Sequence, residues 1–221
     1  MNIDRLVRSK RKTIALIVER DGTLTVRAPL HATEAQIYSL VEQKAGWVEA
    51  HRARMRESSA AVRKKFADGE QFLYLGQAYP LQVVNRPKAL LVLNGRFELS
   101  QAALPQAAQV FERWYRREAR KVITERVESY ARRHDLDYRR IRISGARTRW
   151  GSCSAKGGLN FTWRLVMAPL AVIDYVVVHE LAHLQVRNHS PAFWRRVAEL
   201  MPEFREQRKW LKENGRFLTL E

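Results

Sequence analysis

The chain has 221 residues, of which 46% are hydrophobic and 29% are charged, and it carries a formal net charge of +17. This balance excludes a disordered chain, and the length allows one large domain or two small ones with a substantial core. No apolar run approaches the ~20 residues that a membrane-spanning helix needs, so we expect no membrane partner.

The positive charge raises the question of a polyanionic partner, because a basic surface attracts nucleic acids and nucleotides over a distance. The lysines and arginines are, however, spread along the chain among acidic residues at helical spacings, which is typical of solvated helix faces. Nucleic acid therefore stays an alternative partner through a basic surface, with no binding motif to support it.

The first residues are polar and basic, and the apolar residues 13–18 are too few for a secretory signal. Cys153 is the only cysteine of the sequence, which excludes an internal disulfide and suits a reducing compartment. We therefore expect a cytoplasmic protein.

Strand patterns come first along the chain. Residues 12–18 and 23–28 alternate around an Asp-Gly pair, which is typical of a tight hairpin turn. From residue 33 the apolar spacing becomes helical and predicts one helix over residues 33–56. The basic residues 57–65 predict an exposed linker.

A second group of strands follows, separated by turns that contain glycine, asparagine and proline. We expect these strands to form a small antiparallel meander that joins the N-terminal hairpin in one sheet. Their ranges are 72–75, 79–84, 89–93 and 96–99. The sequence thus predicts an N-terminal β-rich region, residues 1–103, built as an antiparallel sheet with helices.

The remaining residues, 104–221, predict a second domain, which makes the fold class α+β. It begins with a long amphipathic helix, and its centre is a β-hairpin followed by a strongly apolar helix. In chain order we expect a helix over 105–133, strands over 140–144, 149–154 and 159–167, a helix from about residue 170, and helices over 191–200 and 203–214.

The most informative segment is residues 179–189, which read His-Glu-Leu-Ala-His-Leu-Gln-Val-Arg-Asn-His. On a helix, His179 and His183 project from one face, where a single Zn²⁺ can take both imidazoles at about 2.0–2.1 Å. Glu180 points partly toward the same region, where it can act as general base on a metal-bound water. His189 can return as a third ligand and leave the fourth position open, as catalytic zinc sites do. This pattern predicts a zinc hydrolase that uses one ion.

Hydrogen-bonded histidines without a metal are the alternative interpretation. Against it, residues 172–178 are strongly apolar, which indicates a buried helix. Burying the polar cluster that follows costs free energy, and metal binding would offset this cost. The third histidine has the spacing of metzincin proteases, but Val186 stands where those enzymes have glycine. We therefore expect the helix to run to about Arg187, with Asn188 in the left-handed conformation and Ser190 as the N-cap of the next helix.

Several stretches together resemble the YgjP-like metallopeptidase family, zinc proteins whose zincin fold is related to that of SprT-like proteases. By this resemblance His179, His183 and His189 are the zinc ligands, Glu180 is the catalytic carboxylate, and the C-terminal domain is zincin-like. The stretches that carry it are Asp68–Gly76, Arg149–Cys153, Trp163–Pro169, Asp174–His183, Asn188–Ser190 and Phe193–Trp194.

The resemblance leaves the substrate open. The family name implies peptide hydrolysis, and a nucleoside-triphosphate activity that releases pyrophosphate from UTP is also attached to members. For a peptide, we expect an edge strand in residues 149–154 or 159–167 to pair with the extended substrate. Arg149 and Arg164 are candidates for binding the substrate, and with Tyr175 for stabilising an oxyanion. A nucleic-acid-associated protease or binding module is a third alternative.

Overall fold

The computed structural model describes residues 2–19, 22–62, 64–85 and 90–220, with side chains left out of the description at 54–62. Within these ranges, three small sheets and six α-helices make a mixed α+β fold, as the sequence predicts. The chain divides into two compact units, residues 1–63 and residues 64–220. The sequence analysis placed a boundary at residue 103, whereas the second strand group packs within the second of these units.

The first unit contains a three-stranded sheet with the order β1-β3-β2, made of β1 (Arg5–Ser9), β2 (Ala15–Val18) and β3 (Leu24–Pro29). Strands β2 and β3 are antiparallel, with Val18 opposite Leu24, so the predicted hairpin is confirmed, although Asp21 of its turn lies outside the described residues. Strand β1 pairs with β3 in parallel and was not predicted. Its exposed, basic sequence carries no alternating apolar pattern that would reveal a strand.

Two helices, not one, follow this sheet along the chain: α1 (Glu34–Gln43) and α2 (Ala45–Val62). Thr33 and Gln36 form a reciprocal capping box that starts α1. The single predicted helix is wrong because the chain breaks at Lys44, and the predicted linker is wrong because α2 continues to Val62. The unit has its own small apolar core, formed by Leu24, Val26, Ala28, Ala32, Ile37, Val41 and Val48.

The second strand group forms a separate four-stranded sheet with the order β4-β5-β7-β6. Its strands are β4 (Gln71–Tyr74), β5 (Gln77–Val84), β6 (Leu91–Leu93) and β7 (Phe97–Ser100). Strands β5 and β7 are parallel, so the expected simple meander is wrong, and so is the expected union with the N-terminal hairpin. The predicted strand at 89–93 is shorter in the structure, and residue 89 lies outside the described residues.

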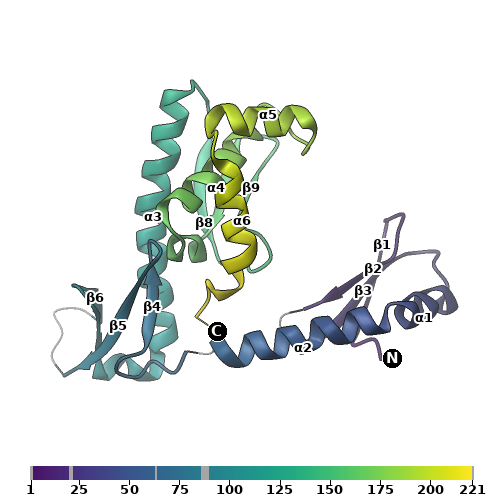
Figure 1. The fold of residues 1–221 in the computed structure, drawn as a ribbon, viewed down its shortest axis with the longest axis horizontal. Helices are drawn as coiled ribbons and strands as arrows, with labels where there is room; N and C mark the ends of the chain where they lie inside the picture. Colours follow the sequence, from purple (N-terminus) through teal and green to yellow (C-terminus); the bar gives the residue numbers. More distant parts are fainter. Residues whose placement is uncertain (1, 20–21, 63, 86–89, 221) are drawn as a thin grey trace. The chain divides into compact units, whose positions relative to one another are not determined.

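Helix α3 (Ala107–Arg133) runs the length of the second unit, after a 3₁₀ segment, Gln101–Gln106 (Figure 1). Its first half packs on the four-stranded sheet through aromatic contacts, for example Phe111 with Phe72 at 4.2 Å between ring centroids. The apolar spacing of this helix predicts an inward face that also includes Tyr130, which is only partly buried. The other predicted residues are buried: Val110, Phe111, Trp114, Ala119, Val122, Ile123 and Val127.

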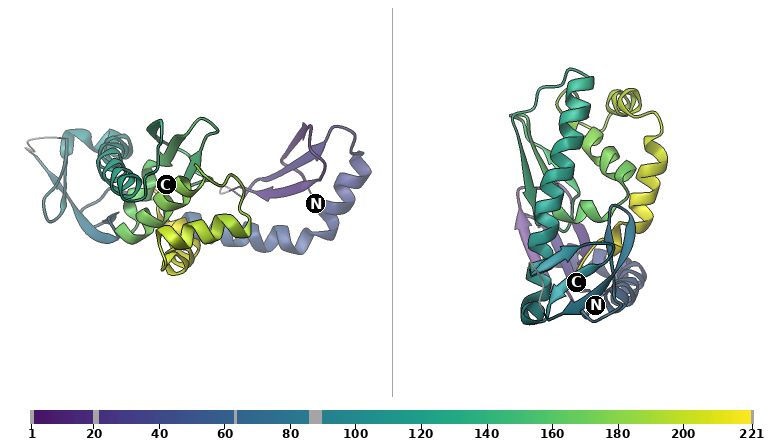
Figure 2. Two further views of the ribbon diagram at one scale, coloured as in Figure 1. Left: turned by 90° about the horizontal axis from the view of Figure 1, so that it is seen from above. Right: turned by 90° about the vertical axis from the view of Figure 1, so that its left-hand side faces the viewer.

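A third sheet and helix α4 lie beside the second half of α3 (Figures 1 and 2). Its strands are β8 (Arg140–Ser144), β9 (Gly151–Cys153) and β10 (Gly158–Thr162), in the order β8-β10-β9. The central β10 pairs in parallel with β8 and antiparallel with β9. The predicted strand to residue 167 is wrong beyond Thr162, because a fully buried 3₁₀ turn, Trp163–Met167, replaces its second half.

Three helices complete the second unit: α4 (Leu170–Ala182), α5 (Pro191–Leu200) and α6 (Phe204–Asn214). The bounds of α5 match the prediction, with Ser190 at the N-cap position and Pro191 at the first helical position, although the serine side chain makes no capping hydrogen bond. Helix α4 contacts α3, α5, α6 and β9 and therefore occupies the middle of the unit. Among the described residues no helix is both long and apolar enough to cross a membrane.

Candidate metal centre

Three histidines converge at the end of α4. The ligand atoms of His179, His183 and His189, one imidazole nitrogen from each, all lie within 4.8 Å of one another. The Nε2 atoms of His179 and His189 are 3.1 Å apart although ten residues separate them in sequence. The structure thus brings together the three histidines that the sequence analysis selected.

The chain turns toward His189 in a way that the sequence did not predict. Helix α4 ends at Ala182, and His183 is its C-cap, so the expected helix to Arg187 is wrong. The turn is closed when the amide of Val186 donates to the carbonyl of Ala182 at 3.0 Å. No positive φ is needed, and Asn188 does not adopt the left-handed conformation that we expected.

A hydrogen bond fixes the ring of His183. Its Nδ1 lies 3.0 Å from the carbonyl oxygen of Val186. Because a carbonyl can only accept, Nδ1 must carry the proton, and Nε2 is left with a free lone pair. Metal-binding histidines commonly use this arrangement, in which a backbone carbonyl sets the tautomer and orients the ring.

The donor set fits a zinc ion. Two nitrogens that each bind zinc at about 2.0–2.1 Å in tetrahedral geometry lie about 3.3 Å apart, close to the observed 3.1 Å. Burial lowers the pKa of His179 to about 3 and also lowers the pKa of His183, and the neighbouring positive groups act in the same direction. Both imidazoles are therefore neutral at ordinary pH, which is the state in which they bind metals.

Two aromatic side chains of α5 hold the imidazoles in place. Phe193 is fully buried, and its ring centroid lies 4.4–4.9 Å from those of all three histidines. Trp194 stacks on His189 at 5.9 Å and on Phe204 of α6 at 5.7 Å. The start of α5 therefore positions His189, which is the most exposed of the three ligands.

Glu180 is buried beside this cluster, with only 4% of its surface exposed. Its Oε2 atom is inaccessible and has no hydrogen-bond partner among the described residues. Burial raises the pKa of Glu180 to about 8, opposed by the charge of Arg149. A buried carboxyl of this kind is costly to fold and is typical of a functional site.

Gly151 is the residue that makes room for this carboxyl. A Cβ atom at position 151 would lie 2.7 Å from Cγ and 2.8 Å from Cδ of Glu180, closer than nonbonded carbon atoms approach. Strand β9 can therefore pass directly over Glu180 only because residue 151 has no side chain. The sequence analysis noticed this glycine only as part of a motif, since its role depends on a contact between distant residues.

Strand β9 is also an edge strand. Since β10 is the central strand of its sheet, residues 159–167 are not available to pair with an extended substrate. Of the two segments that we expected to line the cleft, only residues 149–154 remain, and β9 within them packs against α4. The edge strand and Glu180 are therefore adjacent.

The two arginines suggested as substrate ligands lie in different surroundings. Arg149 is exposed, lies two residues before the start of β9, and acts electrostatically on Glu180. Arg164 is buried at 4% exposure, with its guanidinium 4.3 Å from the ring centroid of Trp163 and donating to the carbonyl of Gly145 at 3.2 Å. The structure thus places Arg149 beside the site, whereas the described contacts of Arg164 are with the protein interior.

An ion pair anchors the histidine helix to the rest of the unit. Asp174 of α4 accepts two hydrogen bonds from Arg126 of α3, at 2.6 and 2.8 Å. Such a two-point contact fixes both position and angle. The partners are 48 residues apart in sequence, so no local pattern indicates the pair.

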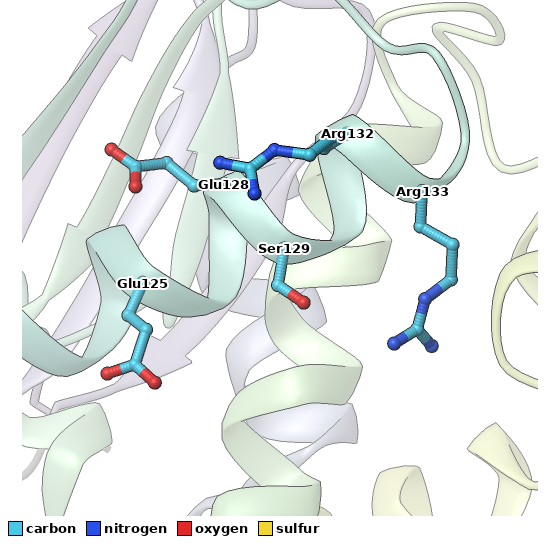
Figure 3. A pocket seen from close by; sticks show the side chains of 5 residues that line it. All are labelled: Glu125, Glu128, Ser129, Arg132 and Arg133. Atoms are coloured by element: carbon cyan, nitrogen blue, oxygen red, sulfur yellow. The ribbon is translucent and has the colours of Figure 1, made fainter.

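A separate hollow lies on α3 and contains none of the candidate site residues (Figure 3). It is lined by Glu125, Glu128, Ser129, Arg132 and Arg133. All five side chains come from one stretch of a single helix and carry both signs of charge, which is typical of a solvated helix face.

Comparison with known proteins places this site in context. The family model described as YgjP-like, metallopeptidase domain, matches residues 12–214. No curated protein matches the sequence. Two solved structures are similar to part of the chain, and both are metallopeptidase zymogens: abylysin of Pyrococcus abyssi and jannalysin of Methanocaldococcus jannaschii.

These two structural similarities are distant. Abylysin is 21% identical, with 42% of this chain and 95% of that chain aligned at a TM-score of 0.38. Jannalysin is 17% identical, with 44% and 96% aligned at a TM-score of 0.36.

Proposed function

We propose that this chain, which belongs to the YgjP-like metallopeptidase family, is a zinc-dependent peptidase that uses Glu180 as its general base. The observation that carries the proposal is the convergence of three imidazoles beside one buried carboxyl at the end of α4. His179, His183 and His189 would hold one zinc ion. Bound zinc acts as a Lewis acid that polarises a carbonyl and lowers the pKa of water.

Glu180 has the position and the proton affinity for acid–base work. It accepts a proton from the attacking water and then delivers this proton to the departing amine nitrogen. Burial, which raises the pKa of Glu180 in the metal-free fold, supports the second half of that cycle, because a carboxyl with increased proton affinity retains the transferred proton until the amine takes it.

The exposed edge of β9 supports a peptide as the substrate. An extended peptide can add to an edge strand through main-chain hydrogen bonds, and β9 lies directly over Glu180. Arg149, two residues before this strand, is the residue that we assign to binding the substrate near the scissile carbonyl. A nucleotide substrate could use the arginines beside the site, Arg149, Arg187 and Arg208, but it would make no use of the edge strand.

The test compares the zinc-loaded protein with two variants. Glu180→Gln should keep one zinc per chain and cleave unfolded casein about 10²–10⁴-fold more slowly. His189→Ala should lose the zinc, measured by elemental analysis after dialysis. Pyrophosphate release from UTP without cleavage of any peptide, abolished in Glu180→Gln, would instead support the nucleotide alternative and refute ours.

A further inference from the structure

Three arginines act electrostatically on residues of the candidate metal centre. Besides Arg149 before β9, the site is approached by Arg187, which follows α4, and by Arg208, which lies on α6. These three arginines come from three different parts of the second unit. We call them the arginine rim.

Contacts within the protein fix two members of the arginine rim. Arg208 lies over the ring of Trp194, 4.4 Å from its centroid, and Trp194 in turn stacks on His189. Arg187 donates to the carbonyls of Ala155 at 2.8 Å and Ser154 at 3.3 Å, in the turn that follows β9.

These charges also act on the groups of the site. Burial is the main cause that lowers the pKa of His179 and of His183, and the charges of Arg208 and Arg187, respectively, act in the same direction. Burial raises the pKa of Tyr175, and the charge of Arg208 opposes that rise. Among the described residues, the groups that act on His179, Glu180 and His183 are arginines, other histidines and one backbone carbonyl. Glu180 is thus the only carboxylate in the set, and it is buried.

We propose that the arginine rim selects peptides that carry Asp or Glu within one or two residues of the scissile bond. The inference rests on the proposed peptidase function and specifies its substrate class. A substrate carboxylate beside the rim supplies a negative partner, which the described part of the chain offers there only as the buried Glu180. Arg208 is the main specificity-determining residue, because its guanidinium is exposed and held on the aromatic platform of Trp194 and Phe204.

The experiment uses the zinc-loaded protein and quenched fluorescent peptides that differ only at the residues flanking the cleaved bond, which are Glu, Gln or Lys. We expect kcat/KM to rise about threefold to fivefold for each added Glu relative to Gln, and to fall for Lys. The preference should shrink between ~50 mM and ~500 mM NaCl, because salt screens exposed charges.

Variants assign the preference to the arginine rim. Arg208→Gln should reduce the ratio of the Glu peptide to the Gln peptide, and Arg208→Glu should reverse it in favour of Lys. The matched control is Arg205→Gln, another exposed arginine of α6, which lies over the Phe204 ring and should leave the ratio unchanged. An equal effect of the control and Arg208→Gln would overturn the role of Arg208.

Binding provides a readout that does not depend on catalysis. In Glu180→Gln, fluorescence anisotropy should show tighter binding of the Glu peptide than of the Gln peptide by a similar factor. Equal cleavage and equal binding of the three peptides would refute the acidic preference and leave the peptidase function standing. Failure to cleave any peptide, with UTP hydrolysed instead, would refute the peptidase function and the inference with it.

Discussion

The burial of Glu180 makes a quantitative prediction about the metal-free protein. The pKa of this carboxyl is about 8 in the fold, compared with 4.5 for an unperturbed group. Between these values the folded state holds a proton that the unfolded state has lost. The free energy of unfolding therefore falls as pH rises through this range, by about 1.4 kcal/mol per pH unit, and levels off above pH 8.

A narrower window separates this effect from that of the histidines. The pKa of His179 is about 3 in the fold and 6.5 when unperturbed. This histidine therefore lowers the free energy of unfolding only as pH falls below 6.5. Between pH 6.5 and pH 8, Glu180 titrates in the fold and His179 does not. The free energy of unfolding should therefore fall by about 2 kcal/mol as pH rises across this range. In Glu180→Gln this slope should be absent, so the variant gains about 2 kcal/mol on the wild type across the window.

The assay is urea unfolding of both proteins in the presence of a chelator, at pH 6.5, 7.25 and 8. Comparing the change in the free energy of unfolding between pH 6.5 and pH 8 removes any constant effect of the substitution itself. The control is Glu199→Gln, in which a 62% exposed carboxylate is changed, and it should keep the wild-type slope. Equal slopes in wild type and Glu180→Gln would show that the carboxyl is not desolvated, and the reasoning would fail.

Three other predictions follow from single contacts of the site. Gly151→Ala should retain zinc but lose most of the peptidase activity, because the added Cβ displaces Glu180, and wild-type kcat with bound zinc would refute this. Asp174→Asn should lower the free energy of unfolding by about 2–3 kcal/mol in urea, since Arg126 loses its charged partner but is a quarter exposed, and a change under about 0.5 kcal/mol would contradict us. Zinc at 100 times its Kd should add about 2.7 kcal/mol, or roughly 5–10 °C in Tm, and a full shift in His189→Ala would exclude that ligand.

Residues with local signals were predictable from the sequence. The Ser-Pro pair at 190 and 191 predicts the start of α5, and the i, i+4 spacing of His179 and His183 predicts their common face. Both signals depend on the backbone within one or two turns, so the fold has little opportunity to override them.

The end of α4 was not predictable in the same way. Apolar spacing continues past Ala182, yet the helix stops there, because the His183 ring donates to the carbonyl of Val186 and the chain turns back toward Phe193. Val186 was judged a poor substitute for glycine, but the turn needs no positive φ. What ends the helix is the packing and hydrogen bonding of the site itself, which local propensity does not contain.

Contacts between distant segments account for the remaining errors. The parallel pairing of β5 with β7, the ion pair of Arg126 with Asp174, and the passage of Gly151 over Glu180 each join residues that no short sequence window contains together. Such contacts also explain how the chain tolerates its site. The buried carboxyl of Glu180 and the desolvated imidazoles of His179 and His183 weaken the metal-free fold. The ion pair and the aromatic contacts of Phe193 hold α4 in place despite that cost, so the structure that supports the site is the part that local patterns predict least.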